Sequence, residues 1–158
     1  MNFERKQKSS GTLTAWNGRP LTMASRRRSR RTAVQALYSW DVGKTDLQRL
    51  LCFDWVDKVA GGDTDFSRML IQGTIESIET VDSLIDEQLE HWDMGRLRRV
   101  DLAILRVSTY SLRFQLDIPA HVTIDEAVEL AKELSTDDSF RFINGVLDGI
   151  SKRIRTST

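Results

Sequence analysis

Five of the six residues from 26 to 31 are arginines, namely Arg26, Arg27, Arg28, Arg30 and Arg31. The planar guanidinium group carries five N–H donors in a fork that matches phosphate oxygens. Like charges this close together repel one another, and a polyanion relieves the repulsion. The run therefore indicates binding to a nucleic acid, although a solvated run of charge or a targeting signal has the same composition.

Two aromatic residues, Tyr38 and Trp40, follow the arginine run. An aromatic ring beside a basic segment is typical of single-stranded RNA recognition, because bases stack on the ring while the cations bind phosphates. Trp40 falls on the apolar stripe of the helix expected here, so we expect it in the core. Tyr38 falls off that stripe and is the better candidate for a base-stacking ring.

The remaining residues offer little for catalysis. His91, His121 and Cys52 are the only soft metal ligands, and none has the spacing of a zinc or iron site, so we expect no metal. Phosphate loops, dinucleotide fingerprints and nucleophile elbows are also missing from the sequence, so we expect no cofactor and no enzymatic activity. The acidic pairs at 125–126 and 137–138 each open an expected helix, where capping is favoured over proton transfer.

The charge is unevenly divided, although 23 basic residues balance 23 acidic ones among 158 residues. Residues 1–31 hold nine of the basic residues and one acidic residue, so the rest of the chain carries a net charge of −8. A basic arm before an acidic body indicates two different partners. No segment has the ~18 apolar residues of a membrane span. A lone cysteine cannot close an internal disulfide, so we expect a cytoplasmic protein with Cys52 buried as a thiol.

The apolar residues recur at three- and four-residue steps, which predicts amphipathic helices. Residues 1–24 are polar and interrupted by glycine and proline, so we expect a disordered basic arm followed by a single helical domain over 25–158. Seven helices are expected, at about 27–42, 46–60, 65–73, 81–92, 97–116, 123–134 and 137–150. No two-residue alternation predicts a strand, so the fold class is all-α, a compact bundle.

Three details of these helices make further predictions. The segment 97–116 is apolar nearly all round, which places it at the centre of the domain. Thr123 and Glu126 have the spacing of a capping box and predict the start of the next helix, and Thr136 or Asp137 is expected to cap the last one. Gly145 lies inside that last helix, where a glycine allows two helices to approach closely.

Several of these segments resemble, in the same order, the bacterial transcription antitermination factors of the NusB family. The resemblance spans residues 25–153. It rests on Arg-Arg-Arg at 26–28, Ala-Val-Gln-Ala-Leu-Tyr-Ser-Trp at 33–40, Arg-Leu at 96–97, Val-Asp at 100–101, Ala-Ile-Leu-Arg at 103–106, Ile-Pro at 118–119, Glu-Ala-Val-Glu-Leu-Ala-Lys at 126–132 and Phe-Ile-Asn-Gly-Val-Leu-Asp at 142–148. The last of these blocks is the most specific.

The resemblance implies an RNA-binding adaptor of about seven helices that carries out no catalysis. Such an adaptor recognises the boxA element of nascent ribosomal RNA together with NusE, the small-subunit ribosomal protein that doubles as an elongation factor. The pair joins other Nus factors and RNA polymerase in an antitermination complex. Some relatives bury the RNA surface in a homodimer, so self-association stays open.

The resemblance also implies roles for individual residues. The basic arm and the aromatic and polar surface at the junction of RNA and partner correspond to Arg26, Arg27, Arg28, Arg30, Tyr38, Asp138, Arg141 and Phe142. Asp101 has the position of an acidic residue that faces NusE. The sequence departs from the family pattern at His121, where Lys is common, at Asp125, where Asn is usual, and at Ser135, where Gly is usual.

Two other functions are compatible with the same helical fold. One is the RNA-binding front domain of a ribosomal RNA methyltransferase, which the NusB family also resembles, although no cofactor-binding βαβ segment follows the helices up to Thr158. The other is a helical protein–protein interaction module in which the arginines are incidental. Unchanged partner binding after the loss of the arginines would support this module.

Overall fold

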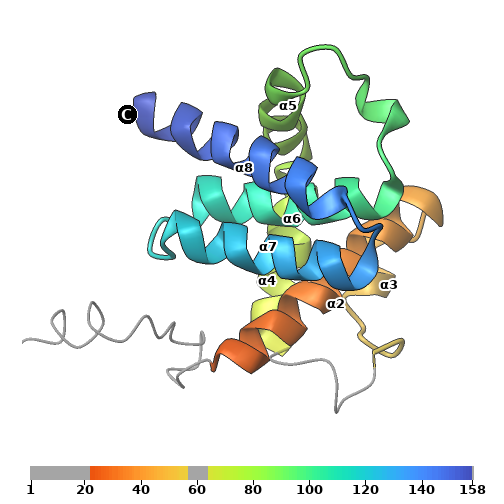
Figure 1. Ribbon diagram of the computed structural model, residues 1–158. Coiled ribbons are helices and arrows are strands. Elements are labelled where there is room, and N and C mark those ends of the chain that lie inside the picture. Colours follow the sequence, from red (N-terminus) through yellow and green to blue (C-terminus); the bar gives the residue numbers. More distant parts are fainter. Residues whose placement is uncertain (1–21, 57–63, 158) are drawn as a thin grey trace, which may run out of the picture.

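The computed structural model describes residues 22–56 and 64–157, which form an all-helical domain (Figure 1). The helices are α2 (Met23–Val42), α3 (Leu47–Leu50), α4 (Thr64–Glu76), α5 (Ile78–Gln88), α6 (Arg99–Phe114), α7 (Ala120–Leu134) and α8 (Ser139–Thr156), with a 3₁₀ turn η1 (Met94–Arg96) before α6. The described residues contain no strand, so the predicted all-α class with seven helices is confirmed. None of these helices is long and apolar enough to cross a bilayer.

Helix α2 begins earlier than predicted. Thr22 is extended, and its hydroxyl accepts a hydrogen bond from the backbone N–H of Ser25 at 3.0 Å. A threonine in this position caps the free N–H groups of a new helix. Met23 and Ala24, which were assigned to the disordered arm, therefore belong to the first turn of α2. Residues 1–21 of that predicted arm lie outside the described residues.

Helix α6 lies at the centre of the domain, as its apolar sequence predicts. Every residue from 101 to 109 is buried, and α6 packs against α2, α4, α5, α7 and α8. In Figure 1, α6, α7 and α8 lie across the view, while α4 and α5 run more steeply behind them. A Cβ atom at Gly73 of α4 would overlap the ring of Tyr110, so α4 and α6 meet where a glycine leaves room.

The glycine expected to allow close packing, Gly145, does not do so. A Cβ atom at this position would meet nothing within 4 Å, and the residue is exposed. Gly149, one turn further along α8, faces the side chain of Gln88 of α5 instead. The prediction was wrong because the sequence places a glycine inside a helix without showing which neighbour it faces.

The second predicted helix is much shorter than the expected range of 46–60. Helix α3 ends at Leu50, and Phe53 adopts a φ of 56°, which an α-helix does not allow. The indole N–H of Trp55 donates to the carbonyl oxygen of Leu50 at 3.0 Å and so satisfies a group that a longer helix would have used. Cys52 is exposed in this turn and not buried as predicted. Residues 57–63 lie outside the described residues.

Helix α7 begins before the predicted capping box. It starts at Ala120, directly after Pro119, whose fixed φ suits the entry to a helix. Thr123 and Glu126 lie inside the helix and are buried, so neither caps it. The prediction that the acidic pair at 125–126 opens a helix is wrong for the same reason. Helix α8 is capped by neither predicted residue, because Asp138 occupies its N-cap without a side-chain hydrogen bond.

Candidate RNA-binding surface

Helix α2 divides the arginine run into an inner and an outer set. Arg26 and Arg30 lie four residues apart and so face the same way, and each is only 2% exposed. Arg27 and Arg28 face solvent, and Arg31 forms an ion pair at the edge with Glu133 of α7. The predicted basic arm is therefore, over these residues, a folded helix that presents only some of its arginines.

The inner arginines share one carboxylate, that of Glu126 on α7. The Nε atom of Arg26 donates to Oε1 of Glu126 at 2.6 Å, and Nε of Arg30 pairs with Oε2. Glu126 is itself 3% exposed. Burial lowers the pKa of Arg30, although the attraction of the Glu126 carboxylate opposes this shift. One carboxylate thus joins two positions of α2 to α7.

Arg30 has further partners inside the domain. Its Nη1 atom donates to Oγ of Ser111 on α6 at 2.9 Å, and Ser111 donates in turn to Oε1 of Gln115 at 2.6 Å. The guanidinium also lies 5.7 Å from the centre of the Phe66 ring on α4. An arginine held in this way reaches a phosphate only by leaving all of these groups. The positions of Arg26 and Arg30 therefore favour a structural role over the RNA contact predicted for them.

The apolar stripe of α2 could have predicted the burial of Arg26 and Arg30, although the run of arginines by itself does not distinguish them from their neighbours. Ala33 and Leu37 are fully buried on the apolar stripe of α2. Two helical turns are about seven residues, so the same stripe extended backwards reaches positions 26 and 30. The sequence gives no comparable signal for Glu126, because its contact with Arg26 joins residues 100 positions apart.

The outward stripe of α2 carries the arginines that remain available. Arg27 and Arg28 form no ion pair within the described part of the chain. Tyr38 is 39% exposed, as predicted from its place off the apolar stripe. It follows Arg27 by eleven residues, about three turns, so the two side chains leave nearly the same side of the helix. Trp40 is partly buried against the core, with the Arg106 guanidinium 5.6 Å from its ring centre.

The other residues predicted to meet RNA lie at the start of α8. Asp138 and Arg141 are exposed, and Phe142 is half-buried against the core. The guanidinium of Arg141 lies 5.5 Å from the centre of the Phe140 ring. The end of α7 just before this region contacts α2 through the ion pair of Glu133. The start of α8 therefore comes directly after the end of α7, which contacts α2.

Asp101, which was predicted to face a protein partner, is buried in the first turn of α6 and is 6% exposed. Its Oδ1 atom accepts a hydrogen bond from the Ser135 hydroxyl at 2.6 Å, and its Oδ2 atom accepts one from the Ser139 hydroxyl at 3.0 Å. These serines flank the connection between α7 and α8, so the carboxylate fixes the turn that carries Asp138. The position of Asp101 favours this orienting role over a direct contact with a partner.

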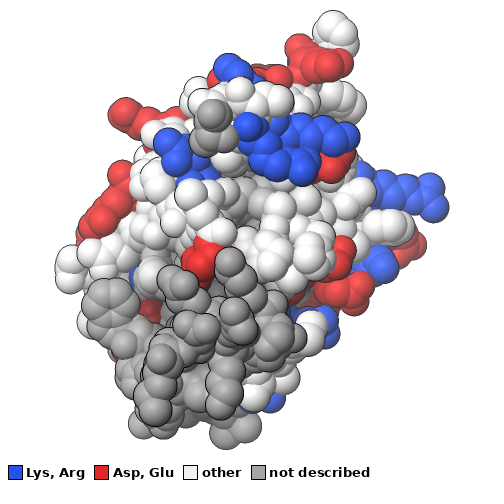
Figure 2. Space-filling view, turned by 90° about the vertical axis from the view of Figure 1, so that its left-hand side faces the viewer, with Lys and Arg blue, Asp and Glu red and all other residues white. Residues whose placement is uncertain are grey.

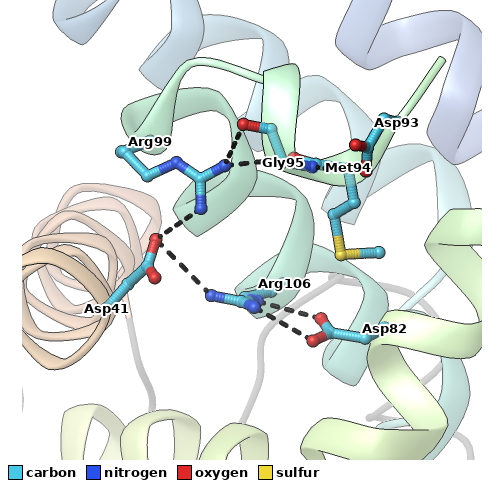
Figure 3. A network of polar contacts seen from close by, with 7 residues as sticks. All are labelled: Asp41, Asp82, Asp93, Met94, Gly95, Arg99 and Arg106. Carbon is cyan, nitrogen blue, oxygen red and sulfur yellow. Dashed lines mark hydrogen bonds and ion pairs between the residues drawn. The ribbon is translucent and has the colours of Figure 1, made fainter.

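The far end of α2 is held by a second ionic cluster, which Figure 3 shows. Arg106 of α6 lies between two aspartates and donates through Nε and Nη2 to both carboxylate oxygens of Asp82 on α5, each at 2.9 Å. Its Nη1 atom lies 3.8 Å from Asp41 near the end of α2, which also accepts a hydrogen bond from Arg99 at 3.2 Å. Arg99 donates further to two carbonyl oxygens around η1. The cluster thus joins α2, α5 and α6, and periodicity did not indicate it.

Basic side chains also gather over the end of α8, on the face seen in Figure 2. Arg153 pairs with Glu87 at 3.3 Å, and Lys152 pairs with Asp148 at 2.8 Å. These cations already have acidic partners, so their attraction for a polyanion is partly offset. The outward arginines of α2 are therefore the stronger candidates for phosphate binding.

The sequence model of the NusB family matches residues 27–152, which include nearly all of the structure just described. The chain is 49% identical over 130 residues to the transcription antitermination protein NusB of Treponema pallidum, an alignment that covers 80% of this chain and 92% of that protein. It also matches the solved structure of T. maritima NusB with a TM-score of 0.71 and 40% identity, over 80% of this chain and 90% of that one.

A third likeness concerns the fold alone. A chain in the crystal structure of the antitermination factors NusB and NusE in complex with dsRNA matches with a TM-score of 0.70 at 24% identity, over 84% of this chain and 99% of that one. The family model and the identity to the Treponema protein decide the classification, because both extend over most of the helical domain. The chain therefore belongs to the NusB family of transcription antitermination proteins.

Proposed function

We propose that this protein binds the boxA element of nascent ribosomal RNA together with NusE, within an antitermination complex that includes other Nus factors and RNA polymerase. The observation that carries the proposal is the pair of exposed arginines, Arg27 and Arg28, on the outward side of α2, where Tyr38 is also exposed and nearly in line with Arg27. Family membership supports it, because a NusB protein of the same fold has been crystallised with NusE and dsRNA. Transcription would place its action in the cytoplasm.

The chemistry of this surface suits a single strand of RNA. Arg27 and Arg28 bind phosphate oxygens, and the Tyr38 ring stacks on an unpaired base. At the start of α8, Asp138 offers a hydrogen-bond acceptor and Arg141 offers donors to the exposed edges of bases or to the partner protein. The protein acts by holding RNA and partner together, and no bond is made or broken.

The test is a fluorescence anisotropy titration of a short boxA RNA and a scrambled RNA with this protein, at low and moderate salt, with and without NusE. We expect preference for boxA and tighter binding in the presence of NusE. Equal binding of both RNAs that disappears with salt would overturn the proposal, since the arginines would then form only a nonspecific polyanion site. Sedimentation at the same concentrations separates a monomer from a homodimer that covers this surface.

A further inference from the structure

We infer that Glu126 is a positioning residue for RNA binding, because its buried carboxylate holds the first turns of α2 so that Arg27 and Arg28 face the RNA. This inference rests on the proposed RNA-binding function. Under this inference, Arg26 and Arg30 do not touch RNA. They bind Glu126 inside the domain and thereby help to orient the exposed arginines.

The geometry of the contact fixes the rotation of α2 as well as its position. Glu126 uses both carboxylate oxygens, one for Arg26 and one for Arg30, and these residues lie about one helical turn apart on a single face. A hydrogen bond to Arg26 and an ion pair to Arg30 along one face oppose rotation of the helix about its axis. Since each residue advances the helix by about 100°, the side chains of Arg27 and Arg28 are directed away from that face.

Glu126 alone balances the buried charges of Arg26 and Arg30 among the described residues, while the Arg31–Glu133 pair lies at the edge of α2. Two guanidinium groups and one carboxylate are buried together, and no other acidic residue in the described part of the chain pairs with Arg26 or Arg30. The remaining polar partner, Ser111, is neutral. Without the carboxylate, two buried cations would repel each other, and the first turns of α2 would move outward to hydrate them.

The other end of α2 does not depend on Glu126. Asp41 contacts Arg99 and Arg106 in the cluster of Figure 3, and Ala33 and Leu37 pack in the core. Loss of the Glu126 carboxylate should therefore displace the arginine-bearing turns while the rest of the helix stays in place.

Electrostatics and positioning predict opposite results for the neutral variant Glu126→Gln. Removing a negative charge near a polyanion site should by itself leave RNA binding unchanged or tighter. If Glu126 positions Arg27 and Arg28, its loss should instead weaken RNA binding. Asp125 provides a matched control, because it is the adjacent residue of α7, is exposed and carries the same charge. Asp125→Asn removes that charge without touching either arginine.

The first measurement is the salt dependence of RNA affinity for the full chain, Glu126→Gln and Asp125→Asn. We expect Glu126→Gln to bind more weakly and to lose about 1.4 from the slope of log affinity against log salt, the share of two phosphate contacts on a single strand. Asp125→Asn should keep the wild-type slope. A substitution that only lowers the fraction of folded protein shifts log affinity by a constant and leaves the slope against log salt unchanged.

A second variant keeps the inference testable if Glu126→Gln folds poorly. In the triple variant Arg26→Met, Arg30→Met and Glu126→Met, apolar side chains replace the whole cluster, and such replacements often keep or raise stability. Helix α2 should stay docked, so the slope should remain that of the wild type. A slope lower by about 1.4 would show that Arg26 and Arg30 bind phosphates themselves and would overturn the inference.

Amide hydrogen exchange separates failure of this inference from failure of the proposed function. We expect faster exchange over residues 23–31 in Glu126→Gln, with wild-type exchange in α6, whichever RNA the protein prefers. Wild-type protein without a preference for boxA would overturn the proposed function alone. Wild-type exchange over 23–31, or a wild-type salt slope in Glu126→Gln, would overturn the positioning role.

Discussion

Neighbouring arginines have different roles in this protein because a helix turns by about 100° at each residue. Arg26 is buried on Glu126, whereas Arg27 is exposed. Arg26→Ala should therefore lower the free energy of unfolding by about 1.5–3 kcal/mol, since a buried hydrogen bond between charged groups is lost while Glu126 keeps its pair with Arg30. Arg27→Ala should change it by no more than about 0.5 kcal/mol, as is usual for surface substitutions. Urea unfolding of both variants measures the difference, and equal losses would contradict the division into two sets.

Tyr38 should contribute to RNA binding through its ring and not through its hydroxyl group. Its exposed position on α2 allows a base to stack on it, and such stacking contributes about 1–3 kcal/mol. We expect Tyr38→Ala to weaken boxA binding by this amount, while Tyr38→Phe binds nearly as the wild type does. Anisotropy titrations of the two variants provide the test. Unchanged affinity in Tyr38→Ala would remove this residue from the RNA surface.

At the scale of elements, two glycines inside helices should respond oppositely to the same change. Gly73→Ala places a methyl group against the ring of Tyr110, so we expect a loss of about 1–3 kcal/mol from overpacking. Gly145→Ala enters open space on α8, so higher helix propensity should raise stability by about 0.5–1 kcal/mol. Thermal unfolding of both variants decides, and a destabilised Gly145→Ala would mean that the glycine has a contact not yet identified.

The connection between α7 and α8 should depend on the hydroxyl of Ser135. This hydroxyl donates to the buried Asp101 carboxylate, and hydrogen bonds to charged groups contribute about 1.5–3 kcal/mol. We expect Ser135→Ala to lower the free energy of unfolding by about that amount. Thr136→Ala is the control, because Thr136 is exposed and contacts Ser139 without touching Asp101. Equal effects of the two substitutions in urea unfolding would refute the orienting role of Asp101.

Periodicity predicted the elements whose burial is local and failed where a distant partner decides. Helix α6 was placed at the centre because its own residues are apolar on nearly every side. The spacing of Thr123 and Glu126 is the same whether the pair caps a helix or lies within one, and it carries no signal of the arginines of α2 that Glu126 contacts. Likewise, the end of α3 depends on the conformation of Phe53 and the indole of Trp55, neither of which has a periodic signal.

At the scale of the whole molecule, α2 is a packed helix of the domain with one exposed side, and over its residues the basic segment is not a loose arm. Its start is joined to α7 through Glu126, its end is joined to α5 and α6 through Asp41 and Arg106, and its middle packs in the core. A surface held at both ends loses little conformational entropy when it binds. The resemblance identified the correct family and fold, but it assigned inner and outer arginines alike to the RNA surface, and the packing separates those that are exposed from those that hold the helix.

The cluster around Arg106 should therefore affect the stability of the whole domain without belonging to the RNA surface. Arg106→Met leaves Asp82 without its cation, whereas Asp41 keeps its contact with Arg99. The Asp82 side chain is 28% exposed, so we expect a loss of about 2–3 kcal/mol, less than that of a fully buried pair. For a domain of this length, that loss lowers Tm by roughly 4–12 °C. Below the transition, the salt slope of RNA binding should equal that of the wild type, because Glu126 still holds the first turns of α2. Asp82→Asn in the Arg106→Met background should restore part of the lost Tm, since it removes the charge that has lost its cation. A lower slope in Arg106→Met would mean that both ends of α2 are needed to present the arginines.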